Sequence, residues 1–280
     1  MGIGTAVAQG AAMNGKRLGI LGFSFLAACA AQTSSSDDAQ QPAENEEAMT
    51  AGAVRLYLSP NKCKKPGEYV ASEVNATYAQ IALDAFCAEQ LVKRSAPDGW
   101  IAIFGSSRLG ETTPEYTNAR TFANLWTTKN TSYPIMSGGG PGIMEASNRG
   151  ANEAGGASIG LSTYFKGPTD ALNTYTTDGY MFSDFETRER AMIRNAKAAV
   201  IYWGGVGTAW ELFMTLSDVQ THRYKTIPII LVGKDWTQAL DPYLQYMKNK
   251  GTISPADLDL FKVVETPQET VTALEAALGV

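Results

Sequence analysis

The chain has 280 residues, of which 44% are hydrophobic and 18% are charged, so it has ample apolar material for a globular core. Its formal net charge of −5 excludes the global basic field with which proteins bind a nucleic-acid polymer. Any phosphate that the chain binds must therefore be held by local backbone amides and a few arginines.

The first residues have the pattern of an export signal. Residues 16–29 read Lys-Arg, the apolar run "LGILGFSFLAA" and Cys29, which is the layout of a secretory signal peptide. The run of 11 apolar residues is shorter than the roughly 20 that a membrane-spanning helix needs. "LAAC" (26–29) resembles the lipobox of bacterial lipoproteins, in which the cysteine is lipidated; the alternative is a disordered apolar tail. The long stretch before Lys16 suggests Met13 as the true start.

The sequence predicts four segments: a lipoprotein-type signal peptide at 1–29, a disordered linker at 30–52, an N-terminal extension with a helix at 53–96, and a single folded domain at 97–280. The linker is polar and acidic and has no hydrophobic periodicity, as in a solvated tether. The likeness to lipoproteins further implies an exported protein anchored by lipid in a bacterial envelope and facing the periplasm. Ala30, in place of an Asp retention signal, points to the outer membrane.

The three cysteines restrict the metal and redox chemistry. If Cys29 carries lipid, Cys63 and Cys87 remain as an even pair in an oxidising compartment. They can form a disulfide between the turn-rich "SPNKCKKPGE" and the helix-like stretch 78–95, or they are two unrelated thiols. No Cys/His cluster has metal-ligand spacing and His222 is the single histidine, so we expect no metal and no His-based catalysis.

From residue 97 onward, short β-rich runs alternate with longer helix-like stretches. Strands are expected at 100–105, 133–138, 157–162, 197–203, 227–232 and 260–265, and helices at 114–130, 142–155, 186–196, 207–223, 236–250 and 267–278. A loop is expected near 164–178. This alternation predicts the α/β class, with a doubly wound parallel sheet whose ligand crevice lies at the carboxyl ends of the strands.

Glycine-rich turns follow three of these expected strands, and two of the turns lead directly into helices. Glycine lets the backbone approach a ligand closely, and a helix N-terminus offers free N–H groups. The spacing matches neither a P-loop nor a dinucleotide fingerprint, which favours a monophosphate site over ATP or NAD chemistry; the alternative is a set of tight turns. The candidate binding residues are Gly105, Ser106, Ser107, Gly138, Gly139, Gly140, Gly142, Gly204, Gly205, Gly207 and Thr208.

The motifs "GSSR", "SGGGPGIMEASNRGANEAGG", "RER" and "GGVGTAWE" together resemble the LOG family of nucleoside 5′-monophosphate phosphoribohydrolases, formerly called lysine decarboxylases. "GGGPGIMEASNRGA" is similar to the signature of its larger bacterial subgroup, and it adds Glu145 to the nucleotide-binding candidates. The resemblance covers roughly 99–265. It implies a Rossmann-like homodimer without a cofactor, which cleaves a nucleoside monophosphate to free base and ribose 5-phosphate. The family's catalytic glutamate and arginine fall on Glu211 and Arg188.

The chain departs from the family at several positions. These changes bear more on the preferred base than on the reaction, except for the change of charge beside Arg188. The family proline is replaced by Trp203, the lysine by Glu189 with Arg190 one position displaced, and the Glu-Gln pair by Thr169 and Asp170, whereas Asn173 and Tyr175 are retained.

Cleavage of an N-glycosidic bond passes through an oxocarbenium-like state, which a carboxylate such as Glu211 can stabilise while it orients or deprotonates water. Arg188 can hold the phosphate or sugar, or assist the leaving base. The alternatives are a helix-dipole carboxylate for Glu211 and a solvated helix face for Arg188. Two other functions stay open: a non-catalytic nucleotide-binding or sensing module, and a pyridoxal-phosphate decarboxylase. The decarboxylase is disfavoured because no lysine occupies a strand end beside a phosphate loop.

Overall fold

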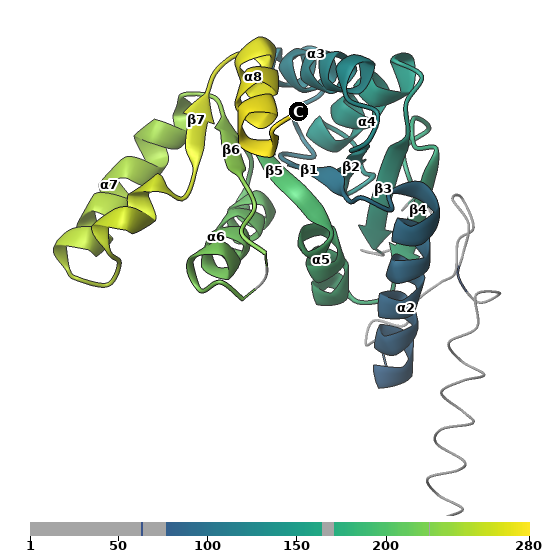
Figure 1. The fold of residues 1–280 in the computed structure, drawn as a ribbon, viewed down its shortest axis with the longest axis horizontal. Coiled ribbons are helices and arrows are strands. Elements are labelled where there is room, and N and C mark those ends of the chain that lie inside the picture. Colours follow the sequence, from purple (N-terminus) through teal and green to yellow (C-terminus); the bar gives the residue numbers. More distant parts are fainter. Residues whose placement is uncertain (1–62, 64–76, 164–170, 224) are drawn as a thin grey trace, which may run out of the picture. The chain divides into compact units, whose positions relative to one another are not determined.

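A computed structural model describes residue 63 and residues 77–163, 171–223 and 225–280 (Figure 1). The expected signal peptide with Cys29, the linker at 30–52 and the Thr169-Asp170 pair lie outside the described residues. The described residues all belong to one compact unit, 47–280. Within them, no helix has the length and apolar character that crossing a membrane requires.

The described residues form a parallel sheet of seven strands in the order β4-β3-β2-β1-β5-β6-β7. Every neighbouring pair of strands runs parallel, with Ile101 of β1 opposite both Ile135 of β2 and Ala198 of β5. The sheet confirms the predicted doubly wound Rossmann-like fold. The strands are β1 (Trp100–Phe104), β2 (Ile135–Ser137), β3 (Ser158–Thr163), β4 (Asp178–Phe182), β5 (Ala196–Tyr202), β6 (Ile229–Val232) and β7 (Lys262–Val264).

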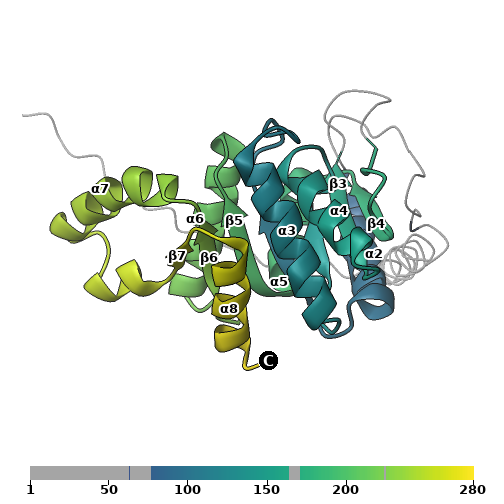
Figure 2. The ribbon, with the colours of Figure 1, turned by 90° about the horizontal axis from the view of Figure 1, so that it is seen from above.

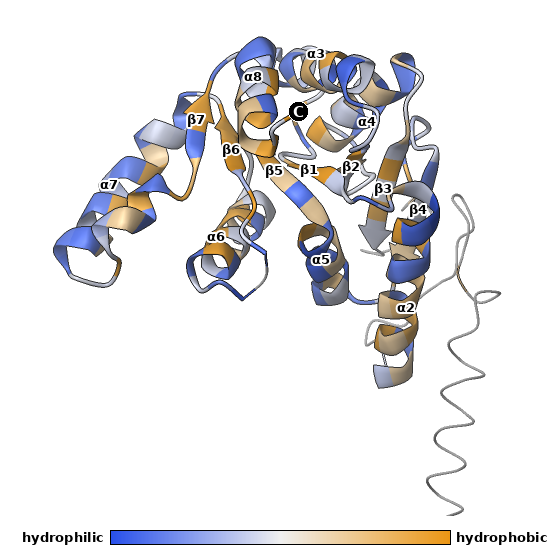
Figure 3. Cartoon of the chain, viewed as in Figure 1, coloured by the Kyte–Doolittle hydropathy of each residue, from blue (hydrophilic) through white to orange (hydrophobic). Residues whose placement is uncertain are grey.

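Helices cover both faces of the sheet, as Figures 1 and 2 show. They are α2 (Tyr78–Ser95), α3 (Pro114–Lys129), α4 (Ile143–Glu153), α5 (Phe185–Arg194), α6 (Val206–Gln220), α7 (Asp235–Asn249) and α8 (Pro267–Leu278), with a short 3-10 helix, η2 (Pro255–Asp259). Successive residues of a strand point to opposite faces of the sheet and pack against different helices. Ile101 and Ile103 pack with α3, α4 and α8, whereas Trp100 and Phe104 pack with α2, α5, α6 and α7. Hydrophobic colours are therefore prominent on the strands in Figure 3.

The edge strand β4 is the one described strand that the sequence pattern does not predict. Its residues Asp178–Phe182 follow the expected loop and include Gly179, which weakens a strand signal. In the structure β4 pairs with β3, and a Cβ on Gly179 would overlap the carbonyl oxygen of Gly160 in that neighbour. The alternating Tyr180 and Phe182, both buried in the core, are the signal that could have identified it.

Helix α2 is fastened to β4 and to the start of α5. The buried carboxylate of Asp84 accepts hydrogen bonds from the Tyr180 hydroxyl (3.0 Å), the Ser183 hydroxyl (2.7 Å) and the Ser183 amide (2.8 Å). At its C-terminal end, Arg94 forms a bidentate ion pair with Asp178, with distances of 2.7 and 2.8 Å. Helix α2, which precedes the expected domain at 97–280, therefore packs into the core of the sheet. Its hydrogen bonds to Ser183 also fix the start of α5, the helix that carries Arg188.

Cys63 and Cys87 are joined by a disulfide with a Cα–Cα distance of 5.3 Å, and Cys87 belongs to the core face of α2. The bond closes a loop between cysteines 24 residues apart, for which the chain-entropy model gives about 3.5 kcal/mol of stabilisation. We expect Cys63→Ser to lower the free energy of unfolding by about this amount, measured by urea denaturation. A reductant should destabilise the wild type and leave the variant unaffected. Equal stability of the wild type with and without reductant would contradict a stabilising bond.

Candidate functional site

A cavity of about 500 Å³ opens where the strand order reverses. The strands that follow β1 along the chain, β2 to β4, lie on one side of it, whereas β5 lies on its other side. The loops after β1 and β5 therefore diverge at their carboxyl ends and leave a crevice, as in other open α/β sheets. The cavity is lined by Gly105, Ser106, Ser107, Arg108, Phe185, Arg188, Gly205, Val206, Gly207, Thr208 and Glu211.

One wall of the cavity is suited to an anion. Helix α6 begins at Val206 behind Gly205, which makes no side-chain capping hydrogen bond, and its first turn holds no acidic residue. The N–H groups of this turn have no partner within the helix, and the positive end of the helix dipole points the same way. Arg108 is exposed in the β1 loop and forms no ion pair with another described residue. Backbone amides and this guanidinium can together hold a phosphate.

The glycine loop at 137–142 packs against residues of the cavity wall but does not line the cavity itself. Gly142 has a φ of 71°, and a Cβ there would overlap the backbone of Ser106 and Ser107. A Cβ on Gly138 would overlap Nη2 of Arg188. These glycines let the loop pack closely behind the β1 loop and behind the arginine. None of Gly138, Gly139, Gly140, Gly142 and Glu145 lines the cavity.

Two other residues of the family signature form hydrogen bonds within the protein. The side chain of Asn173 donates to the carbonyl oxygen of Gly140 (3.1 Å), and its backbone amide donates to that of Gly139 (2.7 Å). Glu145 accepts a hydrogen bond from the Tyr116 hydroxyl at 2.8 Å. This hydrogen bond links α4 to α3, and the nucleotide contact expected of Glu145 stays a prediction.

Arg188 is held rigidly at the inner end of the cavity. It lies on α5, where the side chain of Asp184 caps the helix by accepting from the Thr187 amide at 2.7 Å. Arg188 is 5% exposed, and its Nε donates to the carbonyl oxygen of Leu161 at 2.6 Å. Its Nη1 contacts the carboxylate of Glu189. The solvated helix face that was the alternative for Arg188 is therefore wrong.

Two carboxyl groups accompany this arginine. Glu189 is fully buried, and its Oε2 has no hydrogen-bond partner among the described residues. Glu211 is partly exposed to the cavity from α6. Burial, followed by the negative charge of Glu189, raises the pKa of Glu211 well above its usual value. Burial also raises the pKa of Glu189, against the opposing effect of Arg188. Arg188 and Glu211 thus line the cavity, and the buried Glu189 interacts with both of them, which provides the means for proton transfer beside a bound anion.

The position of Glu211 along α6 bears on its alternative role as a helix-dipole carboxylate. Because α6 begins at Val206, Glu211 is in the second turn, and its side chain lines the cavity. The favourable interaction of a carboxylate with a helix N-terminus fades beyond the first turn. A helix-dipole role therefore does not explain this residue.

Three lining residues were not among the sequence candidates: Arg108, Phe185 and Val206. The rings of Phe185 and Trp210 stack with centroids 5.1 Å apart, and Arg188 lies 5.3 Å from the centre of the Phe185 ring. Phe185 therefore packs beside the arginine and gives the cavity an apolar lining, with Trp210 stacked on its ring. Arg108 directly follows "GSS", which is the signal that could have identified it.

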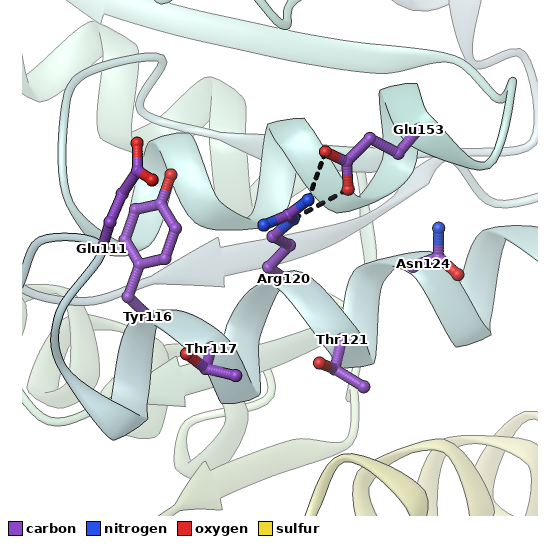
Figure 4. A pocket seen from close by; sticks show the side chains of 7 residues that line it. All are labelled: Glu111, Tyr116, Thr117, Arg120, Thr121, Asn124 and Glu153. Atoms are coloured by element: carbon purple, nitrogen blue, oxygen red, sulfur yellow. Dashed lines mark hydrogen bonds and ion pairs between the residues drawn. The ribbon is translucent and has the colours of Figure 1, made fainter.

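A second, smaller pocket of about 230 Å³ lies on the surface over α3 and α4 (Figure 4). Its arginine is already neutralised, since Arg120 pairs with both carboxylate oxygens of Glu153 at 2.6 and 2.8 Å. Arg149 binds the same carboxylate and also Glu111. We interpret these residues as an ion-pair network that joins α3 and α4, with the pocket as a hollow on its surface. In the described residues, no group of three or more His, Cys, Asp and Glu side chains is placed to hold a metal.

Solved structures with a related fold include two molybdenum-cofactor proteins. The chain matches the molybdenum cofactor carrier protein of Chlamydomonas reinhardtii with 19% identity and a TM-score of 0.49, over 65% of this chain and 99% of that one. It matches the molybdenum cofactor binding protein of Rippkaea orientalis with 18% identity and a TM-score of 0.48, over 64% and 96% of the two chains.

Comparison by sequence is more specific. Residues 144–274 match a family model described as "Possible lysine decarboxylase". The pyrimidine/purine nucleotide 5′-monophosphate nucleosidases of Escherichia coli strain K12 and of Escherichia coli O157:H7 are each 30% identical over 123 residues, which is 39% of this chain. The match spans about a quarter of the length of these relatives, 27%. By these matches and by its strand-end motifs, the chain is similar to the LOG family, with the family model matching residues 144–274.

Proposed function

We propose that this protein hydrolyses the N-glycosidic bond of nucleoside 5′-monophosphates and releases the free base and ribose 5-phosphate. The observation that carries the proposal is the meeting of two features in one cavity: the open N-terminus of α6, and Glu211 with Arg188. The names of the partial sequence relatives support the same reaction class.

In this proposal the phosphate anchors the substrate. Its oxygens accept from the first-turn amides of α6 and pair with Arg108, which fixes the ribose relative to the carboxyl of Glu211. Such anchoring holds the ribose and the catalytic carboxyl in a fixed relative position, and this positioning supplies much of the rate enhancement. Positive charge develops on the sugar as the bond to the base breaks, and carboxyl groups beside it can stabilise that charge.

A panel of purine and pyrimidine nucleoside 5′-monophosphates tests the reaction and identifies the base. We expect the protein, without added metal, to release base and ribose 5-phosphate in equal amounts, measured by chromatography. The corresponding nucleosides should react poorly because they lack the phosphate that positions them. Binding of nucleotides without cleavage of any of them would contradict the hydrolase and favour the non-catalytic binding module instead.

A further inference from the structure

The least expected residue of the site is Glu189. Its side chain is fully buried, although burial of a carboxylate is costly unless hydrogen bonds and opposite charge compensate for it. One oxygen contacts Arg188, whereas Oε2 lacks a donor among the described residues. An acceptor left in this state is rare in native proteins and calls for a functional or chemical reason.

The charges around it suggest that reason. The groups that face one another are Arg188 and Glu189 on α5 and Glu211 on α6, with Arg108 on the β1 loop lining the same cavity. With both carboxyls ionised, the three groups on α5 and α6 would carry a net negative charge in a cavity that otherwise favours an anion. A single proton on Glu211 makes these three groups neutral. The side chains of Glu189 and Glu211 lie within hydrogen-bonding reach of each other, so the same proton supplies a donor to the Glu189 carboxylate.

The contact between Arg188 and Glu189 indicates which of the two carboxyls carries this proton. Burial and the charge of Glu189 both raise the pKa of Glu211 well above its usual value. The pKa of Glu189 is also raised by burial, but Arg188 favours its ionised form directly. Of two close carboxyls, the one that lies farther from the positive charge keeps the shared proton.

We propose that Glu189 is a positioning residue that keeps Glu211 protonated in neutral solution, so that Glu211 meets the nucleotide as a carboxylic acid. This inference rests on the proposed hydrolysis. In the reaction, the O–H of Glu211 donates its proton to the nitrogen of the leaving base while the C1′–N bond breaks and its electron pair goes to the base. A water oxygen then bonds to C1′, and its released proton returns to the carboxylate of Glu211. No further reactant is needed.

The test is the pH dependence of kcat/KM in Glu189→Gln, which keeps the size of the side chain and removes its charge. Without the neighbouring negative charge, Glu211 should lose its proton more readily. We therefore expect the alkaline limb of the profile to move to lower pH by about one unit or more. Glu186→Gln, a change at an exposed position of the same helix, is the matched control and should leave the profile in place. Glu189→Asp retains the charge and should stay closer to the wild type.

Infrared difference spectroscopy gives a second result that does not depend on catalysis. At neutral pH the wild type should show a protonated-carboxyl band that disappears in Glu211→Gln and weakens strongly in Glu189→Gln. If these band changes occur but no nucleotide is cleaved, the proton pair is supported and the proposed hydrolysis fails. If nucleotides are cleaved while Glu189→Gln changes neither the profile nor the band, the inference about Glu189 is overturned.

Discussion

Replacement of Glu211 by glutamine should lower the turnover of nucleoside monophosphates by at least about 10²-fold, which is the lower end of what one positioned acid–base group contributes. Glutamine fills the same space but can neither deliver a proton nor carry the charge that stabilises the sugar cation. Nucleotide affinity should change little, because the α6 amides and Arg108, which are proposed to hold the phosphate, are untouched. Steady-state kinetics and calorimetric binding measure the two effects separately.

The stability of the same variant shows whether lost activity reflects lost structure. Because the pKa of Glu211 is raised in the folded state, its contribution to stability is fully present below the unfolded value of about 4.3 and is lost as pH rises towards the folded pKa. Glutamine has no such dependence. Glu211→Gln should therefore gain stability relative to the wild type as pH rises from acid to neutral, measured as Tm. Lower Tm together with weak nucleotide binding would instead indicate a damaged fold.

Replacement of Arg188 by methionine should have the largest effect on stability. It removes the positive charge paired with the fully buried Glu189, and breaking a buried ion pair from one side typically costs about 3–5 kcal/mol. The loss should be smaller in acid, where Glu189 can take up a proton. Turnover should also fall, because the guanidinium faces the cavity. Urea denaturation at several pH values measures the stability.

The double variant Arg188→Met/Glu189→Gln separates the two roles of the arginine. It removes the unpaired charge, so most of the lost stability should return, whereas activity should not. Full stability of Arg188→Met alone, or a double variant no more stable than the single one, would show that the buried pair is energetically unimportant.

The alternation of hydrophobic runs was sufficient to predict most of this fold. Strands such as 100–105 and 227–232 are short and apolar throughout because both faces of a parallel sheet are covered, and this pattern is local in the sequence. The helix at 78–95 matches α2. The edge strand β4 escaped prediction because its pairing with β3 depends on a neighbour distant in sequence and its glycine weakens the local signal.

For the site, the sequence alone determined that glycine loops lie at strand ends and that Arg188 and Glu211 match a family motif, since spacing along the chain carries both facts. Only the tertiary structure decided which loop lines the cavity and which supports it, because that depends on how the "SGGGPG" loop packs behind Ser106 and Ser107. The tertiary structure also brought Glu189 into contact with Arg188 and close to Glu211. From sequence alone, a charged residue in a helix such as Glu189 is expected to be exposed to solvent. The packing of α5 against the sheet buries it, and the protonation of Glu189 and Glu211 depends on that burial.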